Sequence, residues 1–166
     1  VLSTCREPDR ASALRELSER HPSMCLHALD VTQDKSVRSL AEVLDGTTID
    51  VLLNNAGIAG RIDRQVLGAL DYGVGHETME TNLFGPLRMA EAFLEHVAAS
   101  AQRKIMTISS ALGSISSTTG GSFFYRCSKS AVNMAMASLA RDVAQRGVIV
   151  GVLSPGVVAT DLTADL

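Results

Sequence analysis

Two reactive side chains stand four residues apart in the stretch YRCSK, residues 125–129. The chain has only two tyrosines and three lysines, and it places one of each at Tyr125 and Lys129, positions that share one face of a helix. A phenol with a pKa near ~10 donates a proton reluctantly at neutral pH. An ammonium about 5 Å away would favour the phenolate by roughly 3 kcal/mol, which would prepare the phenol for proton transfer. The alternative is a surface tyrosine beside a solvated lysine. The rest of the sequence must distinguish a catalytic pair from this surface pair.

The composition is that of one globular domain. A chain of 166 residues with 46% hydrophobic content is long enough for a single domain with a sizeable core. The formal charge is −3 and the Lys and Arg residues are scattered, which argues against a nucleic-acid partner. The chain has no run of 18 apolar residues and no signal sequence at its start, so we expect no membrane contact and a cytoplasmic location.

Three cysteines, Cys5, Cys25 and Cys127, occur at unrelated spacings, without a CxxC pair or a histidine cluster. An odd number in this pattern predicts neither a disulfide framework nor a metal site. Cys127 lies inside YRCSK, where a small buried or half-buried thiol is favoured over a nucleophile.

Apolar runs alternate with amphipathic segments along the chain. We expect helices where apolar residues recur at helical spacing, with a bend near Gly85 and Pro86 in the third helix and Gly147 closing the fourth. Residues 58–75 and 114–122 have the composition of loops. The predicted strands are 1–4, 24–30, 104–110 and 148–156, together with the apolar run 49–57, which stops in a turn. Residues 5–20 are predicted to form a turn and a helix with Pro8 in its first turn, and further helices are predicted at 34–45, 76–100 and 123–146.

Nearly continuous apolar strands separated by helices predict an α/β fold with a parallel sheet covered on both faces. Ligands of such sheets bind beyond the carboxyl ends of the strands. The polar signals all follow strand ends: Asp30, the turn 54–57, Ser109 with Ser110, and Pro155 with Gly156. One edge of the sheet is therefore the expected site.

Four motifs in this order resemble the short-chain dehydrogenase/reductase family: NNAG, ISSALGS, YRCSK and SPGVVAT. The likeness runs the length of the chain, and STCREPDRA near its start is similar to the compact, carbonyl-reductase-like branch. The resemblance implies a Rossmann-type doubly wound parallel sheet with helices on both faces. It also implies an NADP-dependent oxidoreductase that transfers hydride between nicotinamide and a carbonyl or secondary alcohol.

The family's catalytic residues match four positions. Tyr125 corresponds to the proton donor and acceptor, and Lys129 to the residue that lowers its pKa and holds the nicotinamide ribose. Ser110 resembles the residue that hydrogen-bonds the substrate oxygen; Ser109 is the weaker candidate because the last residue of a strand normally faces the other way. Asn82, in METNLFG, resembles the asparagine that keeps a water in a proton relay, although a lone helix asparagine is more often solvated or helix-bending.

The resemblance also supplies cofactor contacts. Asp30 and Val31 resemble the pair that holds the adenine. NNAG resembles the segment that lines the approach to the adenosine and the nicotinamide ribose, and the alternative for NNAG is a turn that only ends a strand. The family's pattern puts the remaining contacts, besides Tyr125 and Lys129, at Asn54, Ala56, Gly57, Pro155, Gly156 and Thr160.

The position after the first strand bears on the choice between NADP(H) and NAD(H). An acidic residue there would bond the ribose hydroxyls of NAD and repel a 2′-phosphate. The chain has Thr4 and Cys5 followed by Arg6, and a guanidinium can form charge-assisted bonds to phosphate. We expect NADP(H) to be preferred, although Glu7 could pair with Arg6 or take an NAD-like role.

The family's phosphate loop, TGxxxGxG, does not occur in these 166 residues. That loop and the strand before it would lie centrally, between the strands at 1–4 and 49–54. We therefore expect residues 1–166 to be one dinucleotide-binding domain, incomplete at both ends, that leaves two sheet edges unpaired. The alternative is a truncated, non-catalytic relative that acts as a binding scaffold.

In the family, two long helices commonly pair across a two-fold axis, which implies a homodimer or homotetramer. The helix at 123–146 has a stripe of small and flexible residues that would permit close approach. The alternative is that this stripe packs on the chain's own sheet. The stripe comprises Cys127, Ala131, Met134, Ala135 and Ser138.

Overall fold

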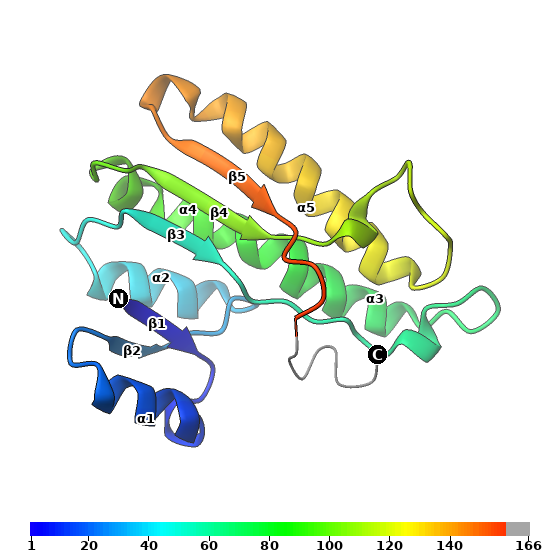
Figure 1. Cartoon of the computed structure of the whole chain (residues 1–166), viewed down its shortest axis with the longest axis horizontal. Helices are drawn as coiled ribbons and strands as arrows, with labels where there is room; N and C mark the ends of the chain where they lie inside the picture. The colour runs from blue at the N-terminus through cyan, green and yellow to red at the C-terminus, as the bar shows by residue number, and fades with distance from the viewer. Residues whose placement is uncertain (159–166) are drawn as a thin grey trace.

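The computed structural model describes residues 1–158, in which five parallel strands alternate with helices (Figure 1). Thr160 lies outside the described residues. The strands are β1 (Leu2–Cys5), β2 (Cys25–Ala28), β3 (Val51–Asn54), β4 (Lys104–Ile108) and β5 (Ile149–Leu153). The helices are α1 (Ser12–Arg20), α2 (Asp34–Val43), α3 (Tyr72–Met79), α4 (Gly85–Ala98) and α5 (Phe123–Asp142).

The strands form two separate sheets. β1 pairs with β2, from Leu2 opposite Cys25 to Cys5 opposite Ala28. β4 lies between β3 and β5, with Ile105 opposite Leu52 on one side and opposite Val150 on the other. Within residues 1–158, β1 and β3 each have one edge without a neighbouring strand, as expected for a sheet that lacks its central strand.

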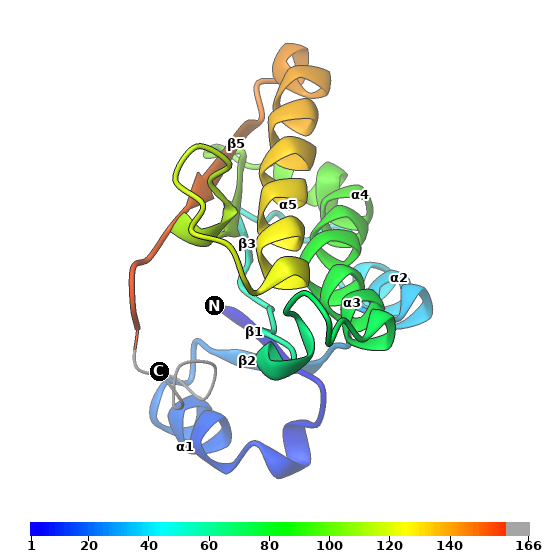
Figure 2. The ribbon, with the colours of Figure 1, turned by 90° about the vertical axis from the view of Figure 1, so that its right-hand side faces the viewer.

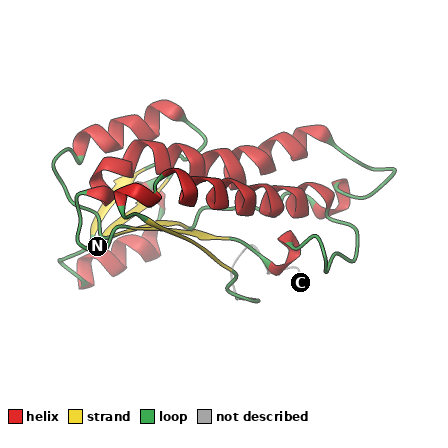
Figure 3. Cartoon of the chain, turned by 90° about the horizontal axis from the view of Figure 1, so that it is seen from above, coloured by secondary structure: helices red, strands yellow, loops and turns green. Residues whose placement is uncertain are grey.

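The helices cover opposite faces. α1 lies on one side of the strands, and α2, α4 and α5 lie on the other (Figures 2 and 3). β3 buries Leu52 and Asn54 but leaves Val51 and Leu53 42% and 52% exposed, so only one of its faces is packed in the part of the chain that the structure describes. The fold is the predicted Rossmann-type α/β arrangement with parallel strands and helices on both faces.

The core lies between the three-stranded sheet and helices α2 and α4. α4 buries Met89, Phe93 and Val97 at a spacing of four residues, which places them on one side of the helix. Ile105 from the central strand β4 and Val37 from α2 complete this layer, and both are fully buried. Burying such side chains contributes about 1.5–3 kcal/mol each, so this layer fixes the strand ends on which the site is built.

The third predicted helix differs from its prediction. It begins at Tyr72 rather than at residue 76, and a π-helical turn, Glu80–Phe84, joins α3 to α4. The irregularity therefore precedes Gly85 and Pro86. The Gly85 amide donates to the Glu80 carbonyl, five residues back, and Pro86 has no N–H for the carbonyl of Asn82. The proline is accommodated by a wider turn, and Asn82 lies in it.

Two other elements, β2 and α5, end earlier than predicted. β2 ends at Ala28 rather than at Asp30, because the Asp30 amide bonds to Ser36 Oγ and its carboxylate accepts from Thr32. α5 ends at Asp142, and a 3₁₀ turn, Ala144–Arg146, continues to Gly147 at φ 69°. Gly147 thus closes the segment, as predicted, but one turn beyond the α-helix.

Candidate active site

α5 carries both members of the pair that the sequence analysis started from. Tyr125 and Lys129 lie on the helix's inner side and are 9% and 5% exposed. Lys129 Nζ lies 5.8 Å from the centre of the Tyr125 ring and donates to the carbonyl of Ile108 at 3.0 Å. Burial lowers the pKa of Lys129 below its usual value, since desolvation disfavours the ammonium. The surface alternative for this pair is wrong.

The two serines that follow β4 have different surroundings. Ser109 is buried, and its hydroxyl donates to Asn133 Oδ1 at 2.6 Å. Ser110 is half-buried and begins the 3₁₀ turn Ala111–Gly113, where its Oγ accepts from the Leu112 amide at 3.2 Å. A hydroxyl that accepts one bond still has its hydrogen to donate. Ser110 is therefore better placed than Ser109 to bind a ligand oxygen.

Gly113 explains how Ser110 comes to lie beside α5. A Cβ atom at position 113 would stand 2.9 Å from both the backbone carbon and the Cβ of Lys129. Only glycine allows the turn after Ser110 to approach the helix this closely. Ser130 Oγ donates to the Gly113 carbonyl at 2.7 Å and fixes the contact.

Asn82, 1% exposed, connects three parts of the site. Its Oδ1 accepts from the Ile58 amide at 2.9 Å, and its Nδ2 donates to the Ile58 carbonyl at 2.9 Å and to Ser128 Oγ at 2.9 Å. Ser128 in turn donates to the carbonyl of Tyr125 at 2.8 Å. Asn82 thereby holds the segment after β3 against α5, which excludes the solvated alternative.

Two of these residues were missed by the sequence analysis. Ser128 and Gln65 are each fully buried, and both bond to Tyr125 backbone atoms. Ser128 lies one position before Lys129 on the helix, so its inward direction could have been inferred from the helical period. Gln65 lies in the 58–71 segment, where no periodicity points to it.

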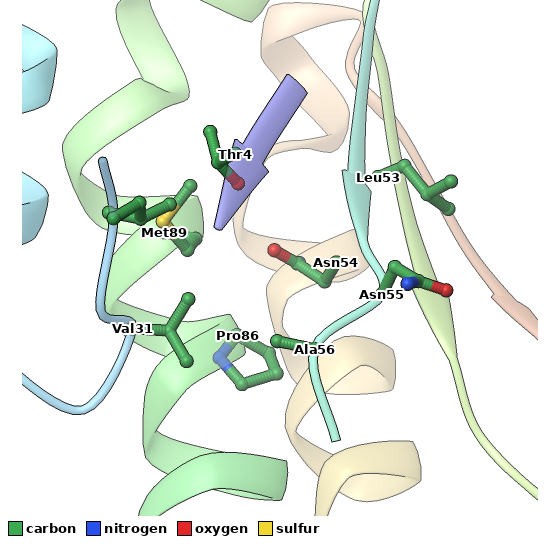
Figure 4. A pocket seen from close by; sticks show the side chains of 9 residues that line it. Thr4, Val31, Leu53, Asn54, Asn55, Ala56, Pro86 and Met89 are labelled. Carbon is green, nitrogen blue, oxygen red and sulfur yellow. The ribbon is translucent and has the colours of Figure 1, made fainter. Parts of the chain in front are cut away.

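A cavity of about 150 Å³ lies between the free edges of β1 and β3 (Figure 4). Asn54 points into it from β3 while Leu53 and Asn55 point away, and Thr4 faces it from β1. Asn54 is 6% exposed and its Nδ2 donates to Thr107 Oγ1 at 3.1 Å. Its Oδ1 is buried without a partner among the described residues, which is unusual for a native side chain. The other lining residues are Leu29, Val31, Ala56, Pro86 and Met89.

Asp30 and Val31 lie beside this cavity with their conformation fixed. Thr32 donates to Asp30 Oδ1 from both its hydroxyl and its amide, at 2.7 and 2.9 Å. The Thr32 hydroxyl is the main cause of a lowered Asp30 pKa, and Arg6 lowers that pKa further by its charge. Val31 is held by Arg88, whose Nη1 donates to its carbonyl at 3.3 Å.

Arg6 follows β1 as predicted and is exposed. Glu7 does not pair with Arg6, because its carboxylate pairs with Arg10 at 2.9 Å. The positive charge of Arg6 is near enough to Asp30 to help lower the pKa of that carboxyl group.

The glycine of NNAG lies next to the catalytic candidates. A Cβ at Gly57 would meet Asn82 Oδ1 at 3.4 Å and Lys129 Nζ at 3.5 Å. Pro155 and Gly156 follow β5, and Gly156 has a φ of 75°, a conformation that favours glycine. Asp30, Ser110 and Pro155 thus follow strand ends and Asn54 is the last residue of β3, all on one edge as the sequence predicts, while Thr160 lies outside the described residues.

Other kinds of site are not found in the described chain. Residues 1–158 contain no group of three His, Cys, Asp or Glu side chains that could hold a metal ion. No helix in that range is long and apolar enough to cross a membrane.

Comparison with known proteins agrees with this geometry. The family model of the short chain dehydrogenases matches residues 1–166. The C-signal protein of Myxococcus xanthus is 39% identical over 115 residues, which cover 69% of this chain and 68% of that protein. A 1-hydroxy-2-glutathionyl-2-methyl-3-butene dehydrogenase of Rhodococcus sp. (strain AD45) is 39% identical over 140 residues, 82% of this chain and 60% of that enzyme.

Solved structures give the same result. The NADPH-bound carbonyl reductase from chicken fatty liver superposes with a TM-score of 0.90 at 33% identity, covering 100% of this chain and 71% of that one. The carbonyl reductase Sniffer of D. melanogaster gives 0.88 at 32% identity, covering 96% and 70%. The fold is the α/β arrangement of these reductases. The chain belongs to the short chain dehydrogenase family.

Proposed function

We propose that the protein containing this chain is an NADP(H)-dependent oxidoreductase of the carbonyl reductase or alcohol dehydrogenase type. The observation that carries the proposal is the placement of Tyr125 and Lys129, both buried on one face of α5, beside the turn that begins at Ser110. A chain that serves only as a scaffold has no need for this arrangement, because burying a lysine has a free-energy cost that packing alone does not offset.

The chain's own residues account for the proton transfer. A bound nicotinamide supplies the hydride. Tyr125 gives its hydroxyl proton to the substrate oxygen, and the Lys129 ammonium stabilises the phenolate that remains. Ser110, which accepts from the Leu112 amide, donates its own hydrogen to the same substrate oxygen and stabilises the charge that develops there.

The cofactor side of the site has the donors and acceptors that an adenosine group would use. Asn54 presents a buried carbonyl oxygen without a partner among the described residues, which a ribose hydroxyl would satisfy. Val31 and Ala56 line the same cavity and offer an apolar surface to the adenine. Gly57 leaves open the space beside Lys129 Nζ, where that ammonium and the Tyr125 hydroxyl would hold the nicotinamide ribose. Pro155 and Gly156 approach from the end of β5.

The preference for NADP(H) rests on Arg6. Its charge lies near Asp30, at the strand end where a 2′-phosphate would be read, and the carboxylate of Glu7 pairs with Arg10 instead. Four of the similar solved structures hold NADPH or NADP.

We further propose a homodimer or homotetramer that pairs through α5. Met134 is 69% exposed, and Cys127 and Ser138 are also exposed, whereas Ala131 and Ala135 are half-buried. The exposure of three of its five residues supports a stripe that faces outward rather than one that packs on the chain's own sheet. The cysteines are free, which fits a reducing, cytoplasmic location.

The second candidate, a non-catalytic binding scaffold, is favoured by one observation. The cavity between β1 and β3 has no glycine-rich loop beside it within these 166 residues, and such a loop is what normally holds the pyrophosphate. The scaffold would bind NADPH weakly or not at all.

The test is turnover of the full-length protein with NADPH and a panel of aldehydes and ketones, followed by NADP⁺ with secondary alcohols. Oxidation of NADPH that requires a carbonyl compound is the expected result. No turnover with any panel member, together with weak or undetectable binding of NADPH, would favour the scaffold instead.

A further inference from the structure

Gln65 is a buried glutamine that no part of the proposed proton transfer uses directly. Its exposed fraction is 0%, and a buried carboxamide is stable only when its donors and acceptors are paired. Its Nε2 donates to the carbonyl of Ala59 at 2.8 Å, and its Oε1 accepts from the backbone amide of Tyr125 at 2.7 Å. One side chain thus joins the segment after NNAG to the first turn of α5.

The first turn of α5 needs an acceptor from outside the helix. Ser122, at the N-cap position, has φ 45° and ψ 45° and makes no side-chain bond to the helix, whereas a usual N-cap serine accepts from an amide of the first turn. Gln65 supplies two such acceptors: its side chain receives the Tyr125 amide, and its backbone carbonyl receives the Phe123 amide at 3.0 Å. The cap of the helix therefore comes from a residue sixty positions earlier.

Gln65 and Asn82 act on neighbouring points of the same segment. Asn82 holds Ile58 through two bonds and reaches α5 at Ser128. Gln65 holds Ala59, the next residue, and reaches α5 at Tyr125. The loop that begins at Gly57 is consequently attached to α5 at Tyr125 itself and at Ser128, three residues further along the helix.

We propose that Gln65 is a positioning residue for the reaction: it sets the backbone of Tyr125 relative to the segment that lines the cofactor side of the site. The inference rests on the proposed function, since it concerns the placement of the proton donor. A displaced phenol would still be present, but its hydroxyl would stand out of line with the substrate oxygen. A misplacement of about 1 Å costs up to about 100-fold in rate.

The test compares Gln65→Met with Gln65→Glu in the full-length protein. Methionine keeps the length and approximate volume of glutamine but has no strong acceptor for the Tyr125 amide. Glutamate keeps that acceptor, loses the amide donor to Ala59 and adds a carboxyl group that is costly to bury when ionised. We expect Gln65→Met to lower kcat by about 10- to 100-fold and to leave KM within about threefold of the wild-type value. The assay is run well below the melting temperature of the variant. Gln65→Glu is expected to keep a higher kcat than Gln65→Met. Gln145→Met, an exposed glutamine after α5, is the matched control.

A second readout does not depend on turnover. Hydrogen exchange at the Tyr125 amide, followed by NMR, is expected to be at least about tenfold faster in Gln65→Met than in the wild type and to stay slow in Gln65→Glu. A Gln65→Met protein with wild-type kcat, or a kcat loss equal in Gln65→Met and Gln65→Glu, overturns the proposal. If the wild type itself has no turnover, the proposed function fails, and unchanged exchange at Tyr125 would then overturn the capping contact independently.

Discussion

Replacing Asn82 by alanine tests whether the site's framework is held by this one side chain. The carboxamide makes three hydrogen bonds of 2.9 Å, two to Ile58 and one to Ser128 Oγ, and it is 1% exposed. Each bond contributes about 1 kcal/mol net, and each buried group left unpaired adds to the cost. We expect Asn82→Ala to lower the free energy of unfolding by about 3–4 kcal/mol, a large part of the 5–15 kcal/mol of a typical domain.

Thermal unfolding followed by circular dichroism measures this change. At about 2–4 °C per kcal/mol for a chain of this size, the melting temperature should fall by about 10 °C. Asn55→Ala is the matched control, because Asn55 is exposed and points away from the cavity; its effect should stay within about 0.5 kcal/mol. A side chain that served only to hold a water would leave stability near that of the wild type. A loss below about 1 kcal/mol for Asn82→Ala would therefore refute the framework role.

Three further predictions concern the cofactor, the assembly and the response to acid. Arg6→Ala should lower kcat/KM for NADPH by about 10- to 100-fold, because charge-assisted bonds contribute about 1.5–3 kcal/mol, and leave the NADH value within about threefold; an unchanged NADPH/NADH ratio would contradict the phosphate contact. Met134→Glu should yield monomers in equilibrium sedimentation, whereas Val43→Glu, on an exposed part of α2's last turn, should not. A wild-type protein that is itself monomeric would contradict the proposed dimer. Because the Asp30 pKa is lowered by Thr32, this bond stabilises the fold above the unfolded-state pKa and is lost as pH falls through the folded-state pKa. Thr32→Val should therefore reduce unfolding stability at pH 7 by less than about 1 kcal/mol, since the group is partly exposed, and by a smaller amount once acid has protonated Asp30; an equal loss at neutral and acid pH would argue against the linkage.

The sequence predicted the elements that follow from short-range patterns. Alternating apolar strands and helices indicated the parallel α/β fold, and the motifs at strand ends indicated one edge as the site. Tyr125 and Lys129 could be placed on one face because the helical period fixes the direction of residues i and i+4. The absence of TGxxxGxG from the sequence also predicted the unpaired edges of β1 and β3.

Contacts between distant segments could not be predicted in this way. Gln65 bonds to a residue sixty positions later, and the polarity of a lone glutamine in a loop is no sign of burial. Pro86 follows the π-helical turn at Glu80–Phe84. A helix can accommodate a proline by a kink, a break or a wider turn, so the sequence alone does not predict which of these forms. Which way the Cys127 and Met134 stripe faces depends on the packing of α5 against the sheet rather than on the stripe's composition.

The central claim is that Tyr125 donates the proton in a reduction that uses NADPH, and Tyr125→Phe tests it most directly. Phenylalanine keeps the ring beside Lys129 and removes only the hydroxyl. Steady-state turnover of the full-length protein with NADPH and its best carbonyl substrate should fall by about three orders of magnitude or more. NADPH binding measured by calorimetry should weaken by no more than about tenfold, the cost of one hydrogen bond to the ribose. Near-normal turnover of a correctly folded Tyr125→Phe protein would contradict the account.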